Sequence, residues 1–355
     1  METMLLNRGT VGGLLTLDEC IPAVESALRA HAEGKAFPPK VLGMHLGNGG
    51  FHIKAGVRTL SRKYFVAKIN ANFPGNSKQN GLPTIQGVIA VCDAEDGKLL
   101  ALMDSIEITI VRTGAATAIA AKYLALPNAG TVTICGCGNQ GAISLEALMK
   151  VRVLKKAYVF DIDEALAERF SSNFSDKLQV TPIKRNELAA ALRSSEIVVT
   201  CTPSRKPFIT ANEIMPGTFI AAVGADSEEK QELCTDLLAS GKLVVDLAAQ
   251  SSTMGELHHA IEENKMSIDD IHAELGMILA GQKPARESER EIIIFDSTGM
   301  ALQDVAAASI VYEKALAKKL AMEFNFADCP GRVHDPDILR RQRDIRAVAS
   351  WFPFR

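Results

Sequence analysis

The hydrophobic pattern of residues 131–296 alternates between short apolar runs and amphipathic stretches. Two of the runs, residues 197–200 and 219–223, are continuously apolar, which is typical of strands buried on both faces. Strands alternating with helices predict an α/β fold with a doubly wound parallel sheet. The predicted strands are 131–135, 157–161, 178–182, 196–201, 218–223, 242–246 and 291–295, and the predicted helices include 164–173, 186–193, 228–239 and 254–264.

The N-terminal part of the chain begins with a different pattern. Residues 17–32 have the period of an amphipathic helix, and Gly34 follows its expected end. Thr16 and Glu19 have the spacing of a capping box at its start. Pro22 lies inside the stretch, so we expect this helix to start late or to kink.

Strand-like runs follow at 87–91 and 99–103, separated by the turn signal Asp96-Gly97. The first 125 residues are therefore α+β in character. A long helix is expected at 300–324, after the last strand of the alternating region. We infer a cofactor domain inserted into a discontinuous substrate domain. The predicted domains are 1–125 plus 300–355 for the substrate and 126–299 for the cofactor.

A glycine-rich turn, Gly-Cys-Gly-Asn-Gln-Gly at 136–141, joins the first of the alternating strands to a helix that continues to residue 151. Gly136 would make the tight turn, Gly138 would let the backbone approach phosphates, and Gly141 would let the helix pack against the strand. The free N–H groups of the helix N-terminus suit a pyrophosphate. This motif predicts a Rossmann-type dinucleotide site.

The second strand of this unit ends on Asp161, where a carboxylate can meet the ribose hydroxyls of a dinucleotide. Such a carboxylate repels a 2′-phosphate, and no Arg or Lys stands beside it, so NAD is favoured over NADP. In the alternative interpretation, Asp161 is only the N-cap of the helix that starts near Glu164.

Composition excludes several classes of protein. With 355 residues, 47% hydrophobic and 23% charged, the chain has the make-up of a soluble two-domain protein. A net charge of −3 without a basic stripe argues against nucleic acid as a partner. No apolar run has membrane-spanning length and the first residues do not resemble a signal peptide, so a cytoplasmic location is expected.

The seven cysteines form no CxxC pair, and we expect reduced thiols, among them Cys137 in the glycine turn. The histidines show no metal-ligand spacing, and adjacent His258 and His259 are expected to point to different sides of a helix. No structural or catalytic metal is predicted.

Four cations before the glycine turn stand in or beside apolar segments: Lys40, Lys54, Lys68 and Arg112. A lysine within an apolar strand is costly to bury unless it is paired, and an Arg fork at the start of an alanine-rich helix suits a carboxylate. Any one of them could be a solvated surface cation. Together, beside a nicotinamide site, they indicate an anionic substrate such as an amino acid.

The chain resembles the ornithine cyclodeaminase/μ-crystallin family from about residue 38 to residue 316. In combination, the shared motifs are highly specific. They are Ala67-Lys68-Ile69-Asn70, Pro74-Gly75-Asn76, Gly81-Leu82-Pro83-Thr84, Arg112-Thr113-Gly114-Ala115-Ala116, residues 120–125, residues 136–140, Gly224-Ala225-Asp226, Lys230-Gln231-Glu232-Leu233, residues 295–299 and Ala301-Leu302-Gln303-Asp304.

The resemblance implies a homodimer whose discontinuous domain also serves dimerisation, and redox chemistry at the carbon bearing an amino acid's nitrogen. By the same resemblance, Lys40, Lys68 and Arg112 bind carboxylate and Thr84 lines the pocket. The implied cofactor residues are Gly136, Gly138, Asn139, Gln140, Gly141, Asp161, Thr202, Ser297, Thr298 and Gly299, the last three in a segment that starts at Asp296 and lies near the nicotinamide.

Asp226 resembles the family's catalytic acid/base, and Lys68 is a second candidate catalytic residue. A titratable group beside the reacting nitrogen is what proton transfer requires. The alternative is that Asp226 is the N-cap of a helix beginning near Glu228.

Lys54 departs from the family's cyclodeaminases, which resemblance suggests carry a glutamate there. Two like charges about 4 Å apart oppose each other by roughly 4 kcal/mol at an effective dielectric near 20, so Lys54 would repel a distal ammonium. We therefore expect an NAD-dependent imine reductase or amino-acid dehydrogenase, acting on a cyclic imine such as pyrroline-2-carboxylate or on a keto acid plus ammonia.

Two alternatives stay open: an ornithine cyclodeaminase that forms proline and ammonia, and a μ-crystallin-like protein that only binds cofactor or small molecules. The tail 327–355 departs from the family. It is basic with an aromatic end, and either docking at a dimer contact or disorder is compatible with its sequence.

Overall fold

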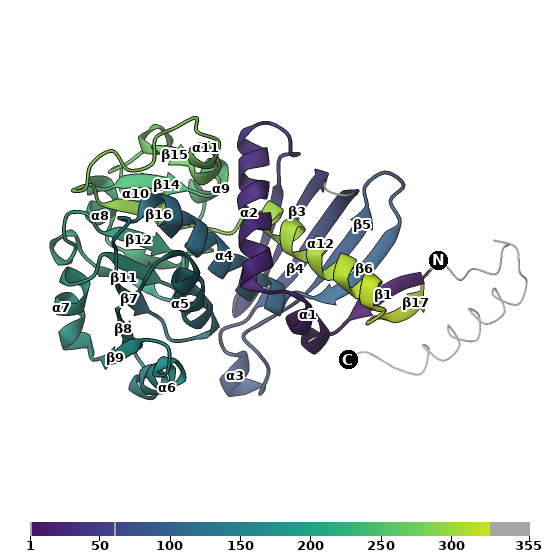
Figure 1. The fold of residues 1–355 in the computed structure, drawn as a ribbon, viewed down its shortest axis with the longest axis horizontal. Coiled ribbons are helices and arrows are strands. Elements are labelled where there is room, and N and C mark those ends of the chain that lie inside the picture. Colours follow the sequence, from purple (N-terminus) through teal and green to yellow (C-terminus); the bar gives the residue numbers. More distant parts are fainter. Residues whose placement is uncertain (1, 60–61, 327–355) are drawn as a thin grey trace, which may run out of the picture.

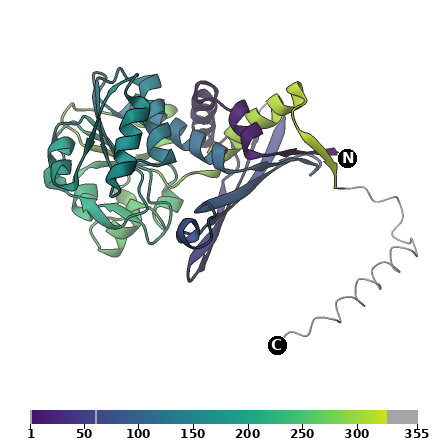
Figure 2. The ribbon, with the colours of Figure 1, turned by 90° about the horizontal axis from the view of Figure 1, so that it is seen from below.

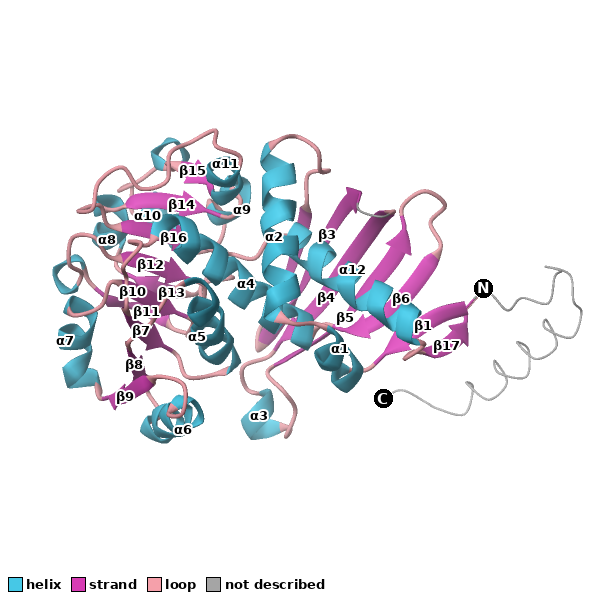
Figure 3. Ribbon diagram, viewed as in Figure 1, coloured by secondary structure: helices cyan, strands magenta, loops and turns pink. Residues whose placement is uncertain are grey.

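The computed structural model describes residues 2–59 and 62–326, which form two large sheets, one two-stranded sheet and their helices (Figure 1). One sheet has seven strands drawn from both ends of that range (Figure 3). Its order is β17-β1-β6-β5-β4-β3-β2, and the pairing is antiparallel except between β1 and β6. The strands are β1 (Glu2–Leu6), β2 (Lys40–Leu46), β3 (Gly49–Thr59), β4 (Lys63–Asn72), β5 (Ile85–Asp93), β6 (Leu99–Asp104) and β17 (Met322–Asn325).

The other sheet has eight strands and is parallel throughout, in the order β15-β14-β16-β12-β10-β7-β8-β9. This confirms the predicted α/β class, and β10, β12 and β16 are buried along their whole length. The strands are β7 (Thr131–Cys135), β8 (Lys156–Phe160), β9 (Gln179–Ile183), β10 (Ile197–Thr200), β12 (Phe219–Ala222), β14 (Lys242–Val245), β15 (Ala273–Glu274) and β16 (Ile293–Asp296). A separate pair is β11 (Arg205–Ile209) with β13 (Gln231–Leu233).

Helices cover both faces of the parallel sheet and one face of the seven-stranded sheet (Figure 2). The latter are α1 (Arg8–Leu14), α2 (Leu17–Ala32) and α12 (Ala301–Lys318), and α4 (Ile106–Leu124) runs buried between the two sheets. The others are α3 (Asn76–Gln79), α5 (Asn139–Val151), α6 (Glu164–Phe174), α7 (Leu188–Arg193), α8 (Thr235–Ser240), α9 (Ala248–Ser251), α10 (Glu256–Glu262) and α11 (Leu275–Leu279), with short 3₁₀ turns at 185–187, 211–213 and 268–270.

The amphipathic helix α2 starts at Leu17 and continues through Pro22 to Ala32, so it does not start late. The capping box is wrong: Thr16 donates to the Glu19 carboxylate (2.6 Å), and its side chain caps no backbone N–H. The predicted turn glycines do take left-handed conformations, with φ of +69° at Gly34 and +78° at Gly97.

Two predicted helices are wrong in extent. Residues 228–239 contain strand β13 and only then helix α8, so Asp226 has no helix to cap near Glu228. The C-terminal helix ends at Lys318, not at 324, because Lys319 adopts a left-handed conformation (φ +54°) and the chain continues as strand β17 against β1.

Among the residues described, no helix is long and apolar enough to cross a bilayer. The six described cysteines are free thiols, and burial raises the pKa of Cys137 to about 12. Cys329 and the tail 327–355 lie outside the described residues, and the domain boundaries remain predictions.

Candidate active site

The glycine turn sits at the carboxyl end of β7, next to β10, where the strand order of the parallel sheet reverses. Open α/β sheets bind ligands at such a point. Gly136 has a φ of +107°, and a Cβ on Gly141 would lie 2.0 Å from the Gly136 carbonyl oxygen. A Cβ on Gly138 would meet no protein atom within 4 Å, so the space in front of the turn is open. These features fit a dinucleotide pyrophosphate.

Helix α5 begins at Asn139, with its first N–H groups facing this open space. Asn139 is exposed, and Gln140 has a buried amide oxygen for which the described residues supply no donor. An unsatisfied buried acceptor at the mouth of the turn is compatible with a hydroxyl or amide of a ligand.

Asp161 follows β8 and lies against the glycine turn. Its carboxylate accepts the backbone N–H groups of Cys137 (2.8 Å) and Asp163 (3.0 Å). The N-cap of α6 is Asp163, whose side chain accepts the N–H of Ala165. Asp161 is therefore not the N-cap of α6, and its carboxylate is held where a ribose is expected.

Thr202 lies on the other side of the glycine turn, just after the end of β10. Its backbone N–H and hydroxyl both donate to one oxygen of Glu232 (2.6 and 2.7 Å), and the Gly224 N–H donates to the other (3.1 Å). Glu232 is fully buried and thus ties the loops after β10 and β12 together. No role was predicted for Glu232 from the sequence.

The predicted cations Lys54, Lys68 and Arg112 come together between the two sheets. Lys54 and Lys68 are directly opposite each other on β3 and β4, so their side chains share the face covered by α12. All three cations are buried, with exposures of 6%, 3% and 7%. Arg112 lies in the second turn of α4, since this helix starts at Ile106 and not at the arginine.

Asp304 on α12 is the counterion of this cation cluster. Its Oδ1 lies 2.8 Å from Lys68 Nζ and 3.3 Å from Arg112 Nε, and Arg112 Nη1 also donates to Gln303 (3.0 Å). Two buried cations contact this one carboxylate, and Lys54 lies directly opposite Lys68 on the neighbouring strand, so the cluster carries positive charge that an anionic ligand can neutralise. Asp304 was predicted only as part of a motif, although a single acid in the apolar first turns of a buried helix is a signal.

Residues 297–299 link the cation cluster to the parallel sheet. Lys54 Nζ donates to the carbonyls of Thr298 (2.7 Å) and Gly299 (2.8 Å). Gly299 has a φ of +83°, and a Cβ there would lie 2.9 Å from Arg112 Nη1, so only glycine fits against the guanidinium. The predicted segment near the nicotinamide thus touches two of the cations.

Asp246 holds this segment in place from the end of β14. Its buried carboxylate accepts the Gly299 N–H (2.6 Å) and the Thr298 hydroxyl (3.0 Å), with the Ser297 hydroxyl at 3.4 Å. Its position directly after an apolar strand is a signal that the sequence analysis missed.

Burial and charge set the proton affinity of the cluster. Burial lowers the pKa of Lys68 to about 7, against the attraction of Asp304 and with the help of the neighbouring Arg112 and Lys54 charges. Burial also lowers the pKa of Lys54. For Asp304, burial acts to raise the pKa, but Lys68 and Arg112 hold it below its usual value. Lys68 can therefore gain or lose a proton near neutral pH.

Asp226 lies in the loop after β12 and pairs with Lys230 (Oδ1–Nζ 2.6 Å). Burial acts to raise its pKa, but Lys230, and then Lys54 and His52, hold the pKa well below the usual range. Asp226 is therefore ionised and electrostatically coupled to Lys54. His52, two residues before Lys54 on the same face of β3, was not predicted as part of the site.

The structure does not bring Lys40 to the cation cluster. Lys40 is exposed at the start of β2 and pairs with Ala55, whose side chain points to the face opposite Lys54 because strand side chains alternate. Thr84 is half-buried in the loop before β5, where its carbonyl accepts the Phe73 N–H (2.8 Å). The pocket-lining role of Thr84 stays a prediction.

Known proteins share this architecture. The model of the ornithine cyclodeaminase/mu-crystallin family matches residues 1–319. An alanine dehydrogenase of Archaeoglobus fulgidus is 40% identical over 327 residues, covering 92% of this chain and 99% of the relative.

Among solved structures, an archaeal alanine dehydrogenase dimer with bound NAD has a TM-score of 0.88 at 38% identity, covering 92% of this chain and all of the other. The Thermococcus litoralis Δ1-pyrroline-2-carboxylate reductase in complex with NADH and L-proline has a TM-score of 0.85 at 32% identity, covering 90% of this chain and 99% of the other. The chain belongs to the ornithine cyclodeaminase/mu-crystallin family.

Proposed function

We propose that this protein is an NAD-dependent oxidoreductase that moves hydride between the nicotinamide and the α-carbon of an amino acid or its imine. The observation that carries the proposal is the buried group of Lys54, Lys68 and Arg112 around Asp304, joined by residues 297–299 to the dinucleotide end of the parallel sheet. The similarity of the chain to an alanine dehydrogenase, and to a pyrroline-2-carboxylate reductase solved with NADH and proline, supports the proposed substrate class.

Each residue has a part in this proposal. Arg112 and Lys54 bind the substrate carboxylate and orient the α-carbon. Lys68, with a pKa of about 7, holds or releases the proton on the substrate nitrogen, and the ionised Asp226 stabilises the positive charge of the protonated nitrogen. When bound, the dinucleotide supplies or accepts the hydride. In the reductive direction, the protonated imine takes hydride at carbon and becomes an amine.

The dinucleotide would be held by the glycine turn, by the start of α5 and by Asp161, with Thr202 and residues 297–299 on the nicotinamide side. The Asp161 carboxylate favours the free ribose hydroxyls of NAD over the 2′-phosphate of NADP. The NAD and NADH bound to the two solved relatives agree with this preference.

A panel of substrates tests the proposal. Purified protein should oxidise NADH with pyrroline-2-carboxylate, or with pyruvate plus ammonia, and should show much lower turnover with NADPH. Ornithine with NAD should yield no proline and ammonia, since Lys54 repels a distal ammonium. Proline and ammonia from ornithine would establish the cyclodeaminase alternative, and no turnover of any imine or keto acid would favour a binding protein.

We further propose that two chains associate through the uncovered face of the seven-stranded sheet. Opposite the helices, this face exposes large apolar side chains at Leu42, Met44, Phe51, Ile69 and Val88, with exposures between 37% and 55%. A patch of this kind on a regular sheet is typical of an interface. The archaeal alanine dehydrogenase relative was solved as a dimer.

A further inference from the structure

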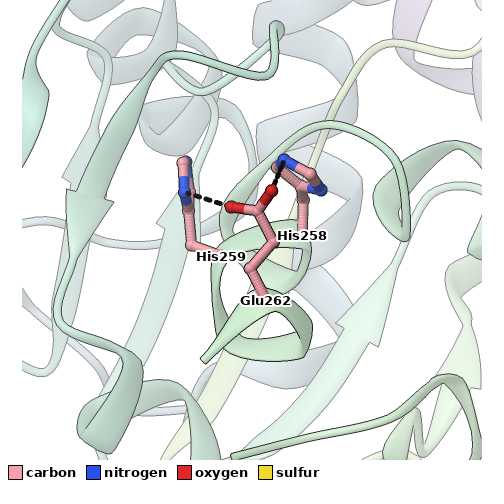
Figure 4. A group of neighbouring side chains, drawn as sticks. All are labelled: His258, His259 and Glu262. Atoms are coloured by element: carbon pink, nitrogen blue, oxygen red, sulfur yellow. Dashed lines mark ion pairs between the residues drawn. The ribbon is translucent and has the colours of Figure 1, made fainter. Parts of the chain in front are cut away.

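Two histidines and a glutamate of helix α10 converge on one point of the surface (Figure 4). His258 Nε2 lies 3.4 Å from one oxygen of Glu262, and His259 Nδ1 lies 4.0 Å from the other. The two rings were expected to point to different sides of a helix, but their centroids lie 5.2 Å apart. Residues i and i+1 are about 100° apart on a helix, and a residue one turn later projects between them, where Glu262 lies.

The ring of His259 is already oriented for a metal ion. Its Nε2 lies 2.8 Å from the backbone carbonyl of Lys230, and a carbonyl can only accept, so Nε2 carries the proton. In the neutral ring, Nδ1 then presents its lone pair toward Glu262. A backbone carbonyl that fixes the tautomer of a ligating histidine in this way is a recurrent feature of metal sites.

We propose that His258, His259 and Glu262 bind a divalent transition-metal ion, with Zn²⁺ the best match, at a surface site with water as the remaining ligand. Imidazole nitrogens and a carboxylate are ligands that Zn²⁺ prefers. Nitrogen and oxygen ligands of a tetrahedral zinc ion are about 3.4 Å apart. The three ligand atoms lie within 4.8 Å of one another, so small rotations of the two histidines and of the Glu262 side chain, which is 62% exposed, bring them into range.

The charges in the cluster of His258, His259 and Glu262 also favour a bound cation. The lone pair of His259 Nδ1 faces the Glu262 carboxylate, and among the described ion pairs Glu262 has no Lys or Arg partner, only these two histidines. The histidine side chains are 18% and 16% exposed, so their rings are restrained while an edge stays open to solvent. Pre-oriented ligands lower the cost of ordering when an ion binds.

Calorimetric titration of metal-stripped full-length protein with ZnCl₂ tests the site in the absence of substrate and cofactor. The wild type should bind one Zn²⁺ per chain at this site, and His258→Ala and His259→Ala should each weaken binding by about tenfold or more. His272→Ala is the matched control, because the His272 ring also bonds a backbone carbonyl, that of Pro284 (2.8 Å), but lies outside the cluster. Unchanged affinity in both cluster variants, or no binding by the wild type, would overturn the proposal.

Cobalt substitution separates this site from the free thiols. Co²⁺ bound by nitrogen and oxygen should give only weak visible bands, whereas ligation by a thiol such as Cys92 or Cys234 would add an intense near-ultraviolet band. Zn²⁺ should also raise the melting temperature of the wild type and of His272→Ala, but not of His258→Ala, because an ion that binds only the folded state stabilises it. A thiol band as the dominant signal would contradict the proposed ligands.

Discussion

At the scale of single residues, the proposed chemistry depends on charges that are buried and partly compensated. Isolated lysines inside apolar strands predicted the cation cluster, since such residues are costly to bury without a purpose. The contacts made by Asp304 and Asp246 could not be predicted, because their partners are far away in sequence. Lys68 and Asp304 are 236 residues apart, and only the fold reveals that they pair.

Asp226→Asn should reduce kcat of imine reduction by about 100-fold or more while leaving NADH affinity nearly unchanged, because a neutral amide does not stabilise the positive charge on the substrate nitrogen. Steady-state kinetics and a fluorescence titration with NADH measure the two quantities. Glu229→Gln is the control, since Glu229 lies in the same loop but pairs with Arg205 at the surface (2.7 Å). A fully active Asp226→Asn would remove Asp226 from the mechanism.

Lys68 should govern the basic limb of the pH profile. Its pKa is about 7 in the folded protein, so its positive charge is present below that pH and is lost as the pH rises through it. The kcat/KM for imine reduction should fall over this range. Lys68→Arg keeps the charge and should move the limb upward by about one pH unit or more.

Lys63→Arg, on the same strand β4, is the control variant, and any titration of the imine substrate itself should be the same for it, for the wild type and for Lys68→Arg. An identical pH profile for wild type, Lys63→Arg and Lys68→Arg would show that the limb belongs to the substrate and not to Lys68.

At the scale of elements, the period of the hydrophobic pattern predicted most strands and helices between residues 131 and 296. It failed at residues 228–239, because three residues of edge strand β13 and a short helix together imitate one amphipathic helix. Lys40 was also predicted to lie with the other cations, but the register of β2 against β3 turns its side chain to the opposite face. The register between two strands cannot be read from the sequence of one strand alone.

The turn between β7 and α5 allows two glycine roles to be separated. Gly141→Ala should lower the free energy of unfolding by about 1–3 kcal/mol, because its Cβ would clash with the Gly136 carbonyl. Gly138→Ala should leave stability nearly unchanged, since its Cβ meets open space, but should weaken NADH binding by obstructing the pyrophosphate. Chemical denaturation and NADH titration measure both. Equal stability losses in the two variants would argue against this division of roles.

At the scale of the whole molecule, the two sheets meet around the buried helix α4, and the proposed substrate site lies where they meet. A composition typical of two domains and a change of pattern near residue 125 predicted two parts of different architecture, but not how they meet around α4. The uncovered apolar face was not predicted, because exposure depends on which side of the sheet the helices cover.

Leu42→Glu should shift the protein from two chains to one in light scattering coupled to size exclusion, since it puts a charge in the apolar face. Ile162→Glu is the control: Ile162 is 95% exposed and follows β8 of the parallel sheet, outside the proposed interface. An unchanged mass for Leu42→Glu, with normal melting behaviour, would exclude this face as the interface.

The central claim concerns where the hydride goes. The most direct measurement uses NADH with deuterium at the transferable position of the nicotinamide C4 and pyrroline-2-carboxylate as acceptor, followed by NMR and mass spectrometry of the product. The account predicts proline that carries one deuterium, on the α-carbon. Proline without deuterium, or with deuterium at another carbon, would contradict it.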